Sequence, residues 1–384
     1  MTPEVIDGNL LVLLRSGVEY FPALISAIDA AREEIYLETY LFEDDATGRC
    51  VAAALCAAAT RSVAVHLMID GFGAQDLPEE LRQRLRSSGV QLLVYRPVIS
   101  RLTLRRQRLR RLHRKVVVID REIAFVGGIN IIDDMDTPGH TPPRFDYAVQ
   151  IKGPLLRPIH ASTAQLWRHV ALAHLRRRAA LSTAVDASPK GTQRAAFVTR
   201  DNVSHRRDIE TAYLTAIGAA RHEILSANAY FLPGRRFREA LIAAATRGVR
   251  VVLVLQGRVE YRLLHYATQA LYGKFLAAGI EIYEYRKSFL HAKVAVIDEE
   301  WATVGSSNID PFSLMLAREA NVVVEDRPFA LELRDSLIRA MEDGARIVVR
   351  ARWLHRSWAQ RALSWICYRT VRLLMGLAGY GAEV

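Results

Sequence analysis

A short segment occurs twice in this chain, and the duplication limits the possible folds more than any other feature. The first copy, LHRKVVVIDREIAFVGGIN, begins at Leu112, and the second, LHAKVAVIDEEWATVGSSN, begins at Leu290. Every matched pair is 178 residues apart (290 minus 112), with no insertion inside the motif. Two ungapped copies of H-x-K-x4-D-x6-G-[GS]-x-N predict a duplicated domain in which each half presents the same set of side chains.

The spacing within each copy indicates where its side chains point. A His and a Lys two positions apart on a β-strand project from the same face, so His113 with Lys115 and His291 with Lys293 each place an imidazole beside an ammonium. The following runs VVVID and VAVID are typical of buried strands. A turn of small residues that ends in an asparagine closes each copy.

If the two copies meet across a pseudo-twofold axis, they form one site rich in hydrogen-bond donors and positive charge. Such a site suits a phosphoryl group. One histidine can attack phosphorus while the other protonates the leaving oxygen and then deprotonates an incoming alcohol. The predicted phosphate-binding residues are Asn130, Ser306 and Asn308. Ser306 stands where the first copy has Gly128, an asymmetry that can separate the roles of the two histidines.

At these residues the chain resembles the phospholipase D superfamily, whose signature is the H-x-K-D motif used twice. The resemblance implies a covalent phosphohistidine intermediate and no metal or other cofactor. It also favours His113 as the nucleophile and His291 as the acid and base, although the residues themselves leave that choice open. Asp120 and Asp298 belong to the signature and are counted with the catalytic set, but their position at strand ends favours a structural role.

Two further acids follow the motifs. Asp146 and Glu319 each precede an apolar strand, 33 and 28 residues after the preceding motif histidine. The reaction needs an acceptor on the second nitrogen of each imidazole, to fix its tautomer and stabilise its cation. In the resembled family an acid at this place has that role, so Asp146 and Glu319 are predicted to orient the histidines; surface acids at strand starts are the alternative.

Strands alternate with helices on both sides of the motifs, which predicts an α/β fold of two phospholipase D-like sandwich domains sharing one site. The segments at 34–42, 61–71 and 88–96 recur at 223–231, 247–257 and 278–286. We divide the chain into a first domain (1–180), a linker (181–195), a second domain (196–345) and a basic tail rich in tryptophan and arginine (346–384).

The repeat fails at one place. Sixteen residues separate Arg96 from His113, but only four separate Arg286 from His291, so the first half carries an insertion within 97–112. The inserted region holds six arginines and no acid. We expect it to form an anion-collecting lip at the mouth of the site; a solvated basic loop remote from the site is the alternative.

The net charge of +11 favours an anionic membrane or a nucleic acid without choosing between them. Three cysteines without metal-site spacing fit a reducing compartment. The N-terminus has no signal-peptide pattern, and no apolar run is long enough for a membrane-spanning helix. In the tail, seven arginines, one acid and three tryptophans suit the headgroup zone of a membrane, with a core-packing or partner-binding helix as the alternative.

Stretches beyond the motifs are similar to bacterial cardiolipin synthases, among them IYLETYLFEDD-x-TG and GSSNIDPFSLMLAREANVVV. This similarity implies a phosphatidyltransferase that joins two phosphatidylglycerols and releases glycerol, at the cytoplasmic face of a bacterial membrane. The expected partner is an anionic phospholipid surface, with neither nucleic acid nor a protein partner. A hydrolytic phospholipase D, a nuclease and a non-catalytic lipid- or nucleic-acid-binding scaffold are the alternatives.

Overall fold

A computed structural model describes residues 4–97, 110–173, 185–259 and 261–375 of the chain. Most of the arginine-rich insertion predicted at 97–112 lies outside these ranges, as do the first residues of the predicted linker and the end of the tail.

The first half alternates strands and helices before its motif and ends in a long helix. Its elements are β1 (Ile6–Arg15), α1 (Ser16–Ala30), β2 (Glu34–Thr39), α2 (Ala46–Thr60), β3 (Ala64–Asp70), α3 (Glu79–Ser87), β4 (Gln91–Tyr95), β5 (Lys115–Ile119), β6 (Ile123–Gly127), β7 (Tyr147–Lys152) and α4 (Leu156–Ala173).

The second half repeats this order. Its elements are β8 (Gln193–Arg200), α5 (Asp208–Ala219), β9 (Glu223–Asn228), α6 (Arg235–Thr246), β10 (Arg250–Gln256), α7 (Arg262–Ala277), β11 (Glu281–Tyr285), β12 (Lys293–Ile297), β13 (Trp301–Gly305), α8 (Pro311–Met315), β14 (Glu319–Glu325) and α9 (Arg327–Gly344). The chain continues into β15 (Ala345–Ile347), α10 (Arg350–Leu354) and α11 (Trp358–Met375).

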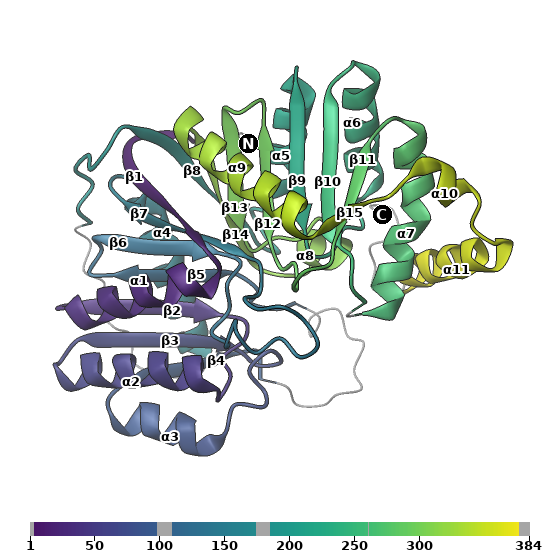
Figure 1. Ribbon diagram of the computed structural model, residues 1–384. Helices are drawn as coiled ribbons and strands as arrows, with labels where there is room; N and C mark the ends of the chain where they lie inside the picture. Colours follow the sequence, from purple (N-terminus) through teal and green to yellow (C-terminus); the bar gives the residue numbers. More distant parts are fainter. Residues whose placement is uncertain (1–3, 98–109, 174–184, 260, 376–384) are drawn as a thin grey trace.

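The strand order displays the duplication directly. The described strands form one sheet in the order β15-β11-β10-β9-β12-β13-β14-β8-β1-β7-β6-β5-β2-β3-β4 (Figure 1). Reading outward from the β8–β1 pair gives the same sequence of equivalent strands in both directions, with β15 added at one edge. The predicted α/β fold is therefore confirmed.

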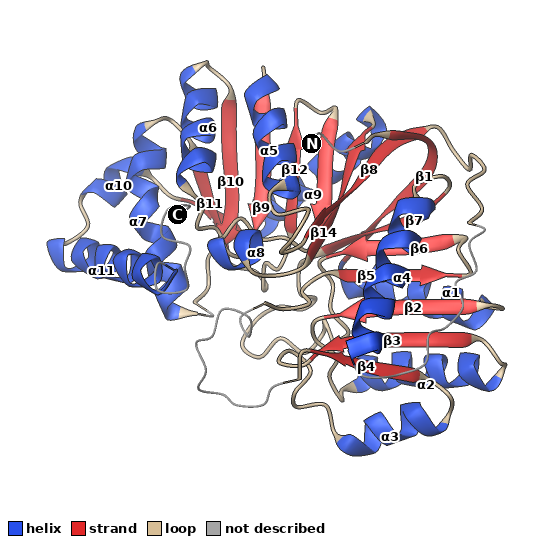
Figure 2. Cartoon of the chain, turned by 180° about the vertical axis from the view of Figure 1, so that it is seen from behind, coloured by secondary structure: helices blue, strands red, loops and turns tan. Residues whose placement is uncertain are grey.

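Three apolar cores hold the layers together. One lies between the halves, where Val116 and Val126 join Val294 and Val304 in a core that α4 and α9 also enter. The other two lie on the outer faces, under α1 to α3 in the first half and under α5 to α7 in the second (Figure 2). The strands that carry the motifs are thus buried on both faces, which explains their continuous apolar runs.

Two features differ from the boundaries expected from the sequence. The N-terminal apolar run forms β1, which pairs with β7 and with β8 and so lies where the halves join. The strand β8 begins at Gln193, inside the segment predicted as a linker (181–195). Alternating exposure along β1 gives it only a short apolar face, and this is why its sequence signal is weak.

The signature aspartates lie at the far ends of the motif strands. The carboxylate of Asp120 accepts hydrogen bonds from the backbone N–H groups of residues 32, 33 and 34, and that of Asp298 accepts the equivalent three from residues 221, 222 and 223. Both residues have positive φ angles, 51° and 53°, which these bonds help to maintain. Four strand residues lie between each aspartate and the lysine of its motif, and these contacts favour the structural role; the place of Asp120 and Asp298 in the predicted catalytic set stays a prediction.

The tail packs on the second half. The helix α11 lies along α7, with Cys367, Val371 and Met375 buried in the second outer core (Figures 1 and 2). Its opposite face exposes Trp358 (82%) and Trp365 (55%). The core-packing alternative thus holds for one face of the helix, and the headgroup-zone role of the exposed face stays a prediction. Among the described residues, no helix has the length and apolar character required to span a bilayer.

Candidate active site

The two histidines of the motifs are bound by acids from the opposite halves. In the first motif, Nδ1 of His113 lies 3.0 Å from Oε1 of Glu319. In the second motif, Nδ1 of His291 lies 2.6 Å from Oδ2 of Asp146. The structure therefore brings together all four residues predicted to form the imidazole–carboxylate pairs, and it pairs them across the pseudo-twofold axis. With Nδ1 engaged, Nε2 is the nitrogen of each ring that remains for chemistry.

Backbone hydrogen bonds also connect each motif histidine to the opposite half. The N–H of His113 donates to the carbonyl of Arg318, which precedes Glu319 in the other half (3.0 Å). The N–H of His291 likewise donates to the carbonyl of Phe145, which precedes Asp146 (2.8 Å). Main chain and side chain of each histidine are thus fixed by the same short segment of the opposite half.

The motif lysines are buried and turn back toward their histidines. Nζ of Lys115 donates to the carbonyl of His113 at 2.5 Å, and Nζ of Lys293 donates to the carbonyl of His291. Lys293 also lies 2.8 Å from Nδ1 of His291 and 3.5 Å from Oδ2 of Asp146. Its ammonium therefore bridges the second pair in a way that Lys115 does not repeat in the first.

Burial and the positive charge of Lys293 determine the pKa values of the ionisable groups in the empty site. Burial, followed by the ammonium of Lys293, lowers the pKa of His291 to about 3. Burial also lowers the pKa of His113, although Glu319 opposes the shift. Burial alone would raise the pKa of Asp146, but Lys293 and His291 outweigh it and lower that pKa. Burial lowers the pKa of Lys115 to about 7. An anion that enters the site therefore meets groups ready to take up protons.

The turn residue that differs between the two copies, Gly128 or Ser306, lies beside the carboxylate that binds a motif histidine. A Cβ atom at Gly128 would lie only 2.4 Å from Oδ1 of Asp146, so glycine is required there. In the second half, Oγ of Ser306 donates to Oε2 of Glu319 at 2.5 Å and accepts the N–H of Ala320 at 3.0 Å. The hydroxyl proton of Ser306 is thus directed to Glu319, and the predicted role of Ser306 as a phosphate ligand stays a prediction.

The motif asparagines are placed alike. Oδ1 of Asn130 accepts the N–H of Leu41 at 3.2 Å, and Oδ1 of Asn308 accepts the N–H of Tyr230 at 3.4 Å. Since each amide oxygen faces the backbone, each amide nitrogen is available as a donor on its other side. This arrangement is compatible with the predicted role of Asn130 and Asn308, which stays a proposal.

Sequence reasoning missed an aromatic residue beside the nucleophile candidate. The ring of Tyr40 lies 5.0 Å from that of His113, and Nζ of Lys115 lies 5.4 Å from its centroid. By register, Tyr40 corresponds to Ala229 in the second half. Because only one half contains the tyrosine, the repeat offered no signal for it.

The variable residue between His and Lys also differs between the halves. Arg114 is buried and binds Glu38 through two hydrogen bonds, with a third to Ser162 on α4. The corresponding residues of the second half are Ala292 and Ala227. One half therefore uses a buried ion pair where the other uses two small apolar side chains.

Two imidazoles that face a common site, each oriented by an acid of the other half and flanked by a buried lysine, define a phospholipase D-like enzyme. Among the described residues, no cluster of three or more His, Cys, Asp or Glu could hold a metal ion. A family model described as "Cardiolipin synthase, PLD-like domain" matches residues 24–135 and 213–341.

Similarity to known proteins identifies the family within this class of enzymes. Cardiolipin synthase B of Escherichia coli (strain K12) is 37% identical over 97% of this chain and 90% of its own length. Probable cardiolipin synthase YwiE of Bacillus subtilis (strain 168) is 30% identical over 82% of this chain and 62% of its own length. The chain belongs to the cardiolipin synthase family of phospholipase D-type phosphatidyltransferases.

A solved structure supports the fold independently. The phosphatidylserine synthase of Haemophilus influenzae Rd KW20 superposes with a TM-score of 0.69, covering 94% of this chain and 93% of its own, at 13% identity. At that identity the likeness concerns the fold alone.

Proposed function

We propose that this enzyme transfers a phosphatidyl group from one phosphatidylglycerol to another and releases glycerol. The observation that carries the proposal is the crossed pairing of His113 with Glu319 and of His291 with Asp146. It presents two imidazoles with the same tautomer to one shared space, as a two-step phosphoryl transfer requires.

In the first step, Nε2 of His113 attacks the phosphorus of the donor lipid. The new P–N bond forms as the P–O bond to the glycerol headgroup breaks, and the proton on Nε2 of His291 passes to the departing glycerol oxygen. In the empty site His291 is neutral, since burial and Lys293 lower its pKa to about 3. The negative charge of the phosphodiester raises the pKa of His291 again, so this histidine takes up a proton when the substrate binds.

In the second step, a hydroxyl of another phosphatidylglycerol gives its proton to His291 and attacks the phosphorus. The P–N bond breaks, cardiolipin leaves, and His113 returns to its neutral form. Glu319 stabilises the cationic ring while the phosphohistidine exists. Throughout, Lys115, Lys293, Asn130 and Asn308 hold the non-bridging phosphate oxygens.

The lipid surface is engaged by the outward face of α11. Trp358, Trp365, Ile366 and Leu373 are exposed there, and Arg369 stacks over Trp365 at 4.8 Å. Apolar side chains beside arginines suit the headgroup zone of an anionic membrane. We place the enzyme at the cytoplasmic face of a bacterial membrane, peripherally bound.

The test is the purified full chain in phosphatidylglycerol micelles, with lipid products separated by thin-layer chromatography. Cardiolipin with an equal amount of free glycerol supports the proposal. Phosphatidic acid as the sole product would instead identify a hydrolase. His113→Ala and His291→Ala are each expected to abolish turnover, and full activity in His291→Ala would contradict the two-histidine scheme.

A further inference from the structure

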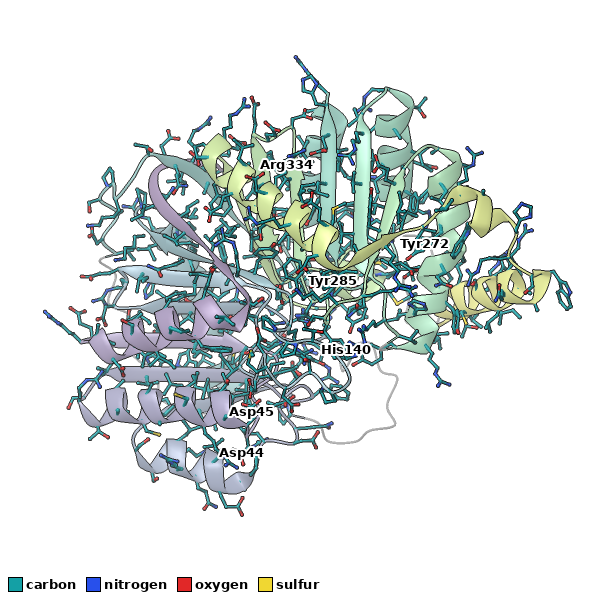
Figure 3. All side chains as sticks on the ribbon, viewed as in Figure 1. Asp44, Asp45, His140, Tyr272, Tyr285 and Arg334 are labelled. Carbon is teal, nitrogen blue, oxygen red and sulfur yellow. The ribbon has the colours of Figure 1, made fainter. Side chains whose placement is uncertain are left out.

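A small pocket opens beside the site in the second half. It lies at the carboxyl ends of β9 and β10, under the start of α7, and encloses about 30 Å³. That volume accommodates about two water-sized groups. Polar and aromatic side chains make up most of its lining, including Tyr230, Gln256, Tyr261, His265, Thr268 and Tyr272. Tyr272, which belongs to α7, is labelled in Figure 3.

Gln256 brings an unused hydrogen-bond donor to this pocket. Its side-chain oxygen accepts the N–H of Arg258 at 3.4 Å, which fixes the orientation of the amide. Its Nε2 atom is buried and has no hydrogen-bond partner among the described residues. The residue is only 8% exposed. A buried donor without a partner costs free energy, and an oxygen atom of a ligand would relieve that cost.

His265 supplies a second donor. Oε1 of Gln269 accepts a hydrogen bond from Arg356 at 3.1 Å, so the amide nitrogen of Gln269 faces Nε2 of His265 at 2.9 Å. Nε2 of His265 is therefore the acceptor, and Nδ1 carries the proton. Burial lowers the pKa of this histidine, so the ring is neutral at pH 7. Gln256 and His265 thus offer uncharged donors, which suit hydroxyl oxygens, while the guanidinium of Arg258, also in the lining, donates to the carbonyls of Arg286 and Gly139.

The equivalent residue in the first half has different contacts. By strand register Gln256 corresponds to Asp70, and the two residues accept equivalent turn N–H groups, from Arg258 and Phe72. The second carboxylate oxygen of Asp70, however, accepts the N–H of Leu112 at 2.8 Å. Leu112 ends the segment that carries the insertion of the first half. Both oxygens of Asp70 are thus engaged by backbone N–H groups, whereas Nε2 of Gln256 has no partner among the described residues.

The pocket lies on the side of His291. The strands β12, β9 and β10 are neighbours, and Lys293 pairs with Asn228, which pairs with Leu255. Two strand spacings of about 4.8 Å place Leu255 about 10 Å from Lys293, a distance that the lysine side chain and a lipid headgroup span together. Tyr230, in the pocket wall, donates its N–H to Asn308 of the second motif.

We propose that this pocket binds the free hydroxyls of the glycerol headgroup, with Nε2 of Gln256 as the principal donor. The inference rests on the proposed function and specifies its acceptor. The departing glycerol and the attacking headgroup exchange a proton with the same histidine, so by microscopic reversibility they occupy the same place. A glycerol headgroup has two free hydroxyls, in agreement with the size of the pocket. A pocket beside His291 also supports His291 as the acid and base.

The test separates donor cleavage from acceptor choice. The donor is phosphatidyl-p-nitrophenol, whose leaving group lacks hydroxyls, and glycerol competes with 1-propanol as the acceptor. In Gln256→Met, p-nitrophenol release should match the unsubstituted enzyme. Transfer to glycerol relative to 1-propanol should fall by about three- to tenfold, through KM rather than kcat, as expected for the loss of one uncharged hydrogen bond. Gln150→Met, the same change on β7 of the other half, is the matched control and should leave the ratio unchanged.

The outcomes are distinct. No p-nitrophenol release by the unsubstituted enzyme would refute the proposed function itself. Normal release with an unchanged glycerol-to-propanol ratio in Gln256→Met would overturn the pocket proposal alone. If the Met variant is unstable, Gln256→Glu keeps the acceptor for Arg258 and removes the donor, and it should lower the same ratio at a pH where p-nitrophenol release is normal.

Discussion

Oδ2 of Asp146 lies 2.6 Å from Nδ1 of His291, although the aspartate belongs to the first half and the histidine to the second. Conversely, Glu319 of the second half binds His113 of the first half. Each acid therefore serves the histidine of the other repeat, and the consequence for kinetics can be measured.

The crossed pairs predict different defects for the two acids. Asp146→Asn impairs His291, the proposed acid and base, whereas Glu319→Gln impairs His113, the proposed nucleophile. With phosphatidyl-p-nitrophenol, whose leaving group needs no protonation, Asp146→Asn should retain the initial burst but lose turnover by about 10²- to 10⁴-fold. Glu319→Gln should lose the burst. The opposite assignment of bursts would mean that each acid serves its own half.

The signature aspartates should matter for stability rather than chemistry. Asp120→Asn weakens the carboxylate that holds three backbone N–H groups, at an expected cost of about 1–2 kcal/mol of unfolding free energy. Thermal unfolding measures this loss, and kcat per folded molecule should stay within about twofold. Asp298→Asn should behave alike, because its three contacts are equivalent. A loss of kcat without a loss of stability would restore both residues to the catalytic set.

Anion binding should weaken above neutral pH. Burial lowers the pKa of Lys115 to about 7, so its charge in the empty site is present below pH 7 and lost above it. A bound phosphodiester stabilises the charged form of Lys115, so the contribution of this residue to the affinity should be constant well below pH 7 and fall by up to about tenfold per pH unit above 7. Dimethyl phosphate, used as a competitive inhibitor, keeps one charge throughout. Lys115→Arg should abolish the decline above pH 7, and an unaltered pH profile in that variant would exclude Lys115 as the source of this decline.

The ion pair of Arg114 and Glu38 should show strong coupling. Either residue alone, changed to Ala, leaves a buried charge and should cost about 3–5 kcal/mol of unfolding free energy. The double variant reproduces the Ala227 and Ala292 arrangement of the second half and should cost at least about 2 kcal/mol less than the sum of the single changes. Denaturant unfolding of the four proteins completes the cycle, and additive losses would contradict the coupling.

Membrane binding should depend on the outward face of α11. Changing Trp358 and Trp365 together to Ala removes exposed aromatic surface and should weaken binding to phosphatidylglycerol vesicles about tenfold or more. Sedimentation with vesicles measures the change. Val203→Ala alters another exposed apolar side chain (72%) and serves as the control. Equal loss in both variants would remove the helix from this role.

Much of the fold could be predicted because the same pattern of segments occurs in both halves, so each half supports the assignment of strands in the other. The recurring segments at 34–42, 61–71 and 88–96 contain β2, β3 and β4. The strand β1 was missed, because only one of its faces is apolar and its partners lie more than a hundred residues away.

The members of the site were easier to predict than their contacts. Spacing placed His113, Lys115 and Asp146 at strand ends, where the structure has them. It carries no information on which half supplies each acceptor, since a twofold axis makes both pairings possible. The contact of Ser306 with Glu319 was equally hidden, because it depends on the extra methylene that distinguishes glutamate from the aspartate of the other half.

The exchange of acids also sets the order of events during synthesis. His113 leaves the ribosome 206 residues before Glu319, so the first half completes its strands while its histidine still lacks an acceptor. At about 5–20 residues per second, the delay is roughly 10–40 s. A nascent or prematurely ended chain therefore lacks the acid that orients His113, and we expect such a chain to be inactive toward lipid.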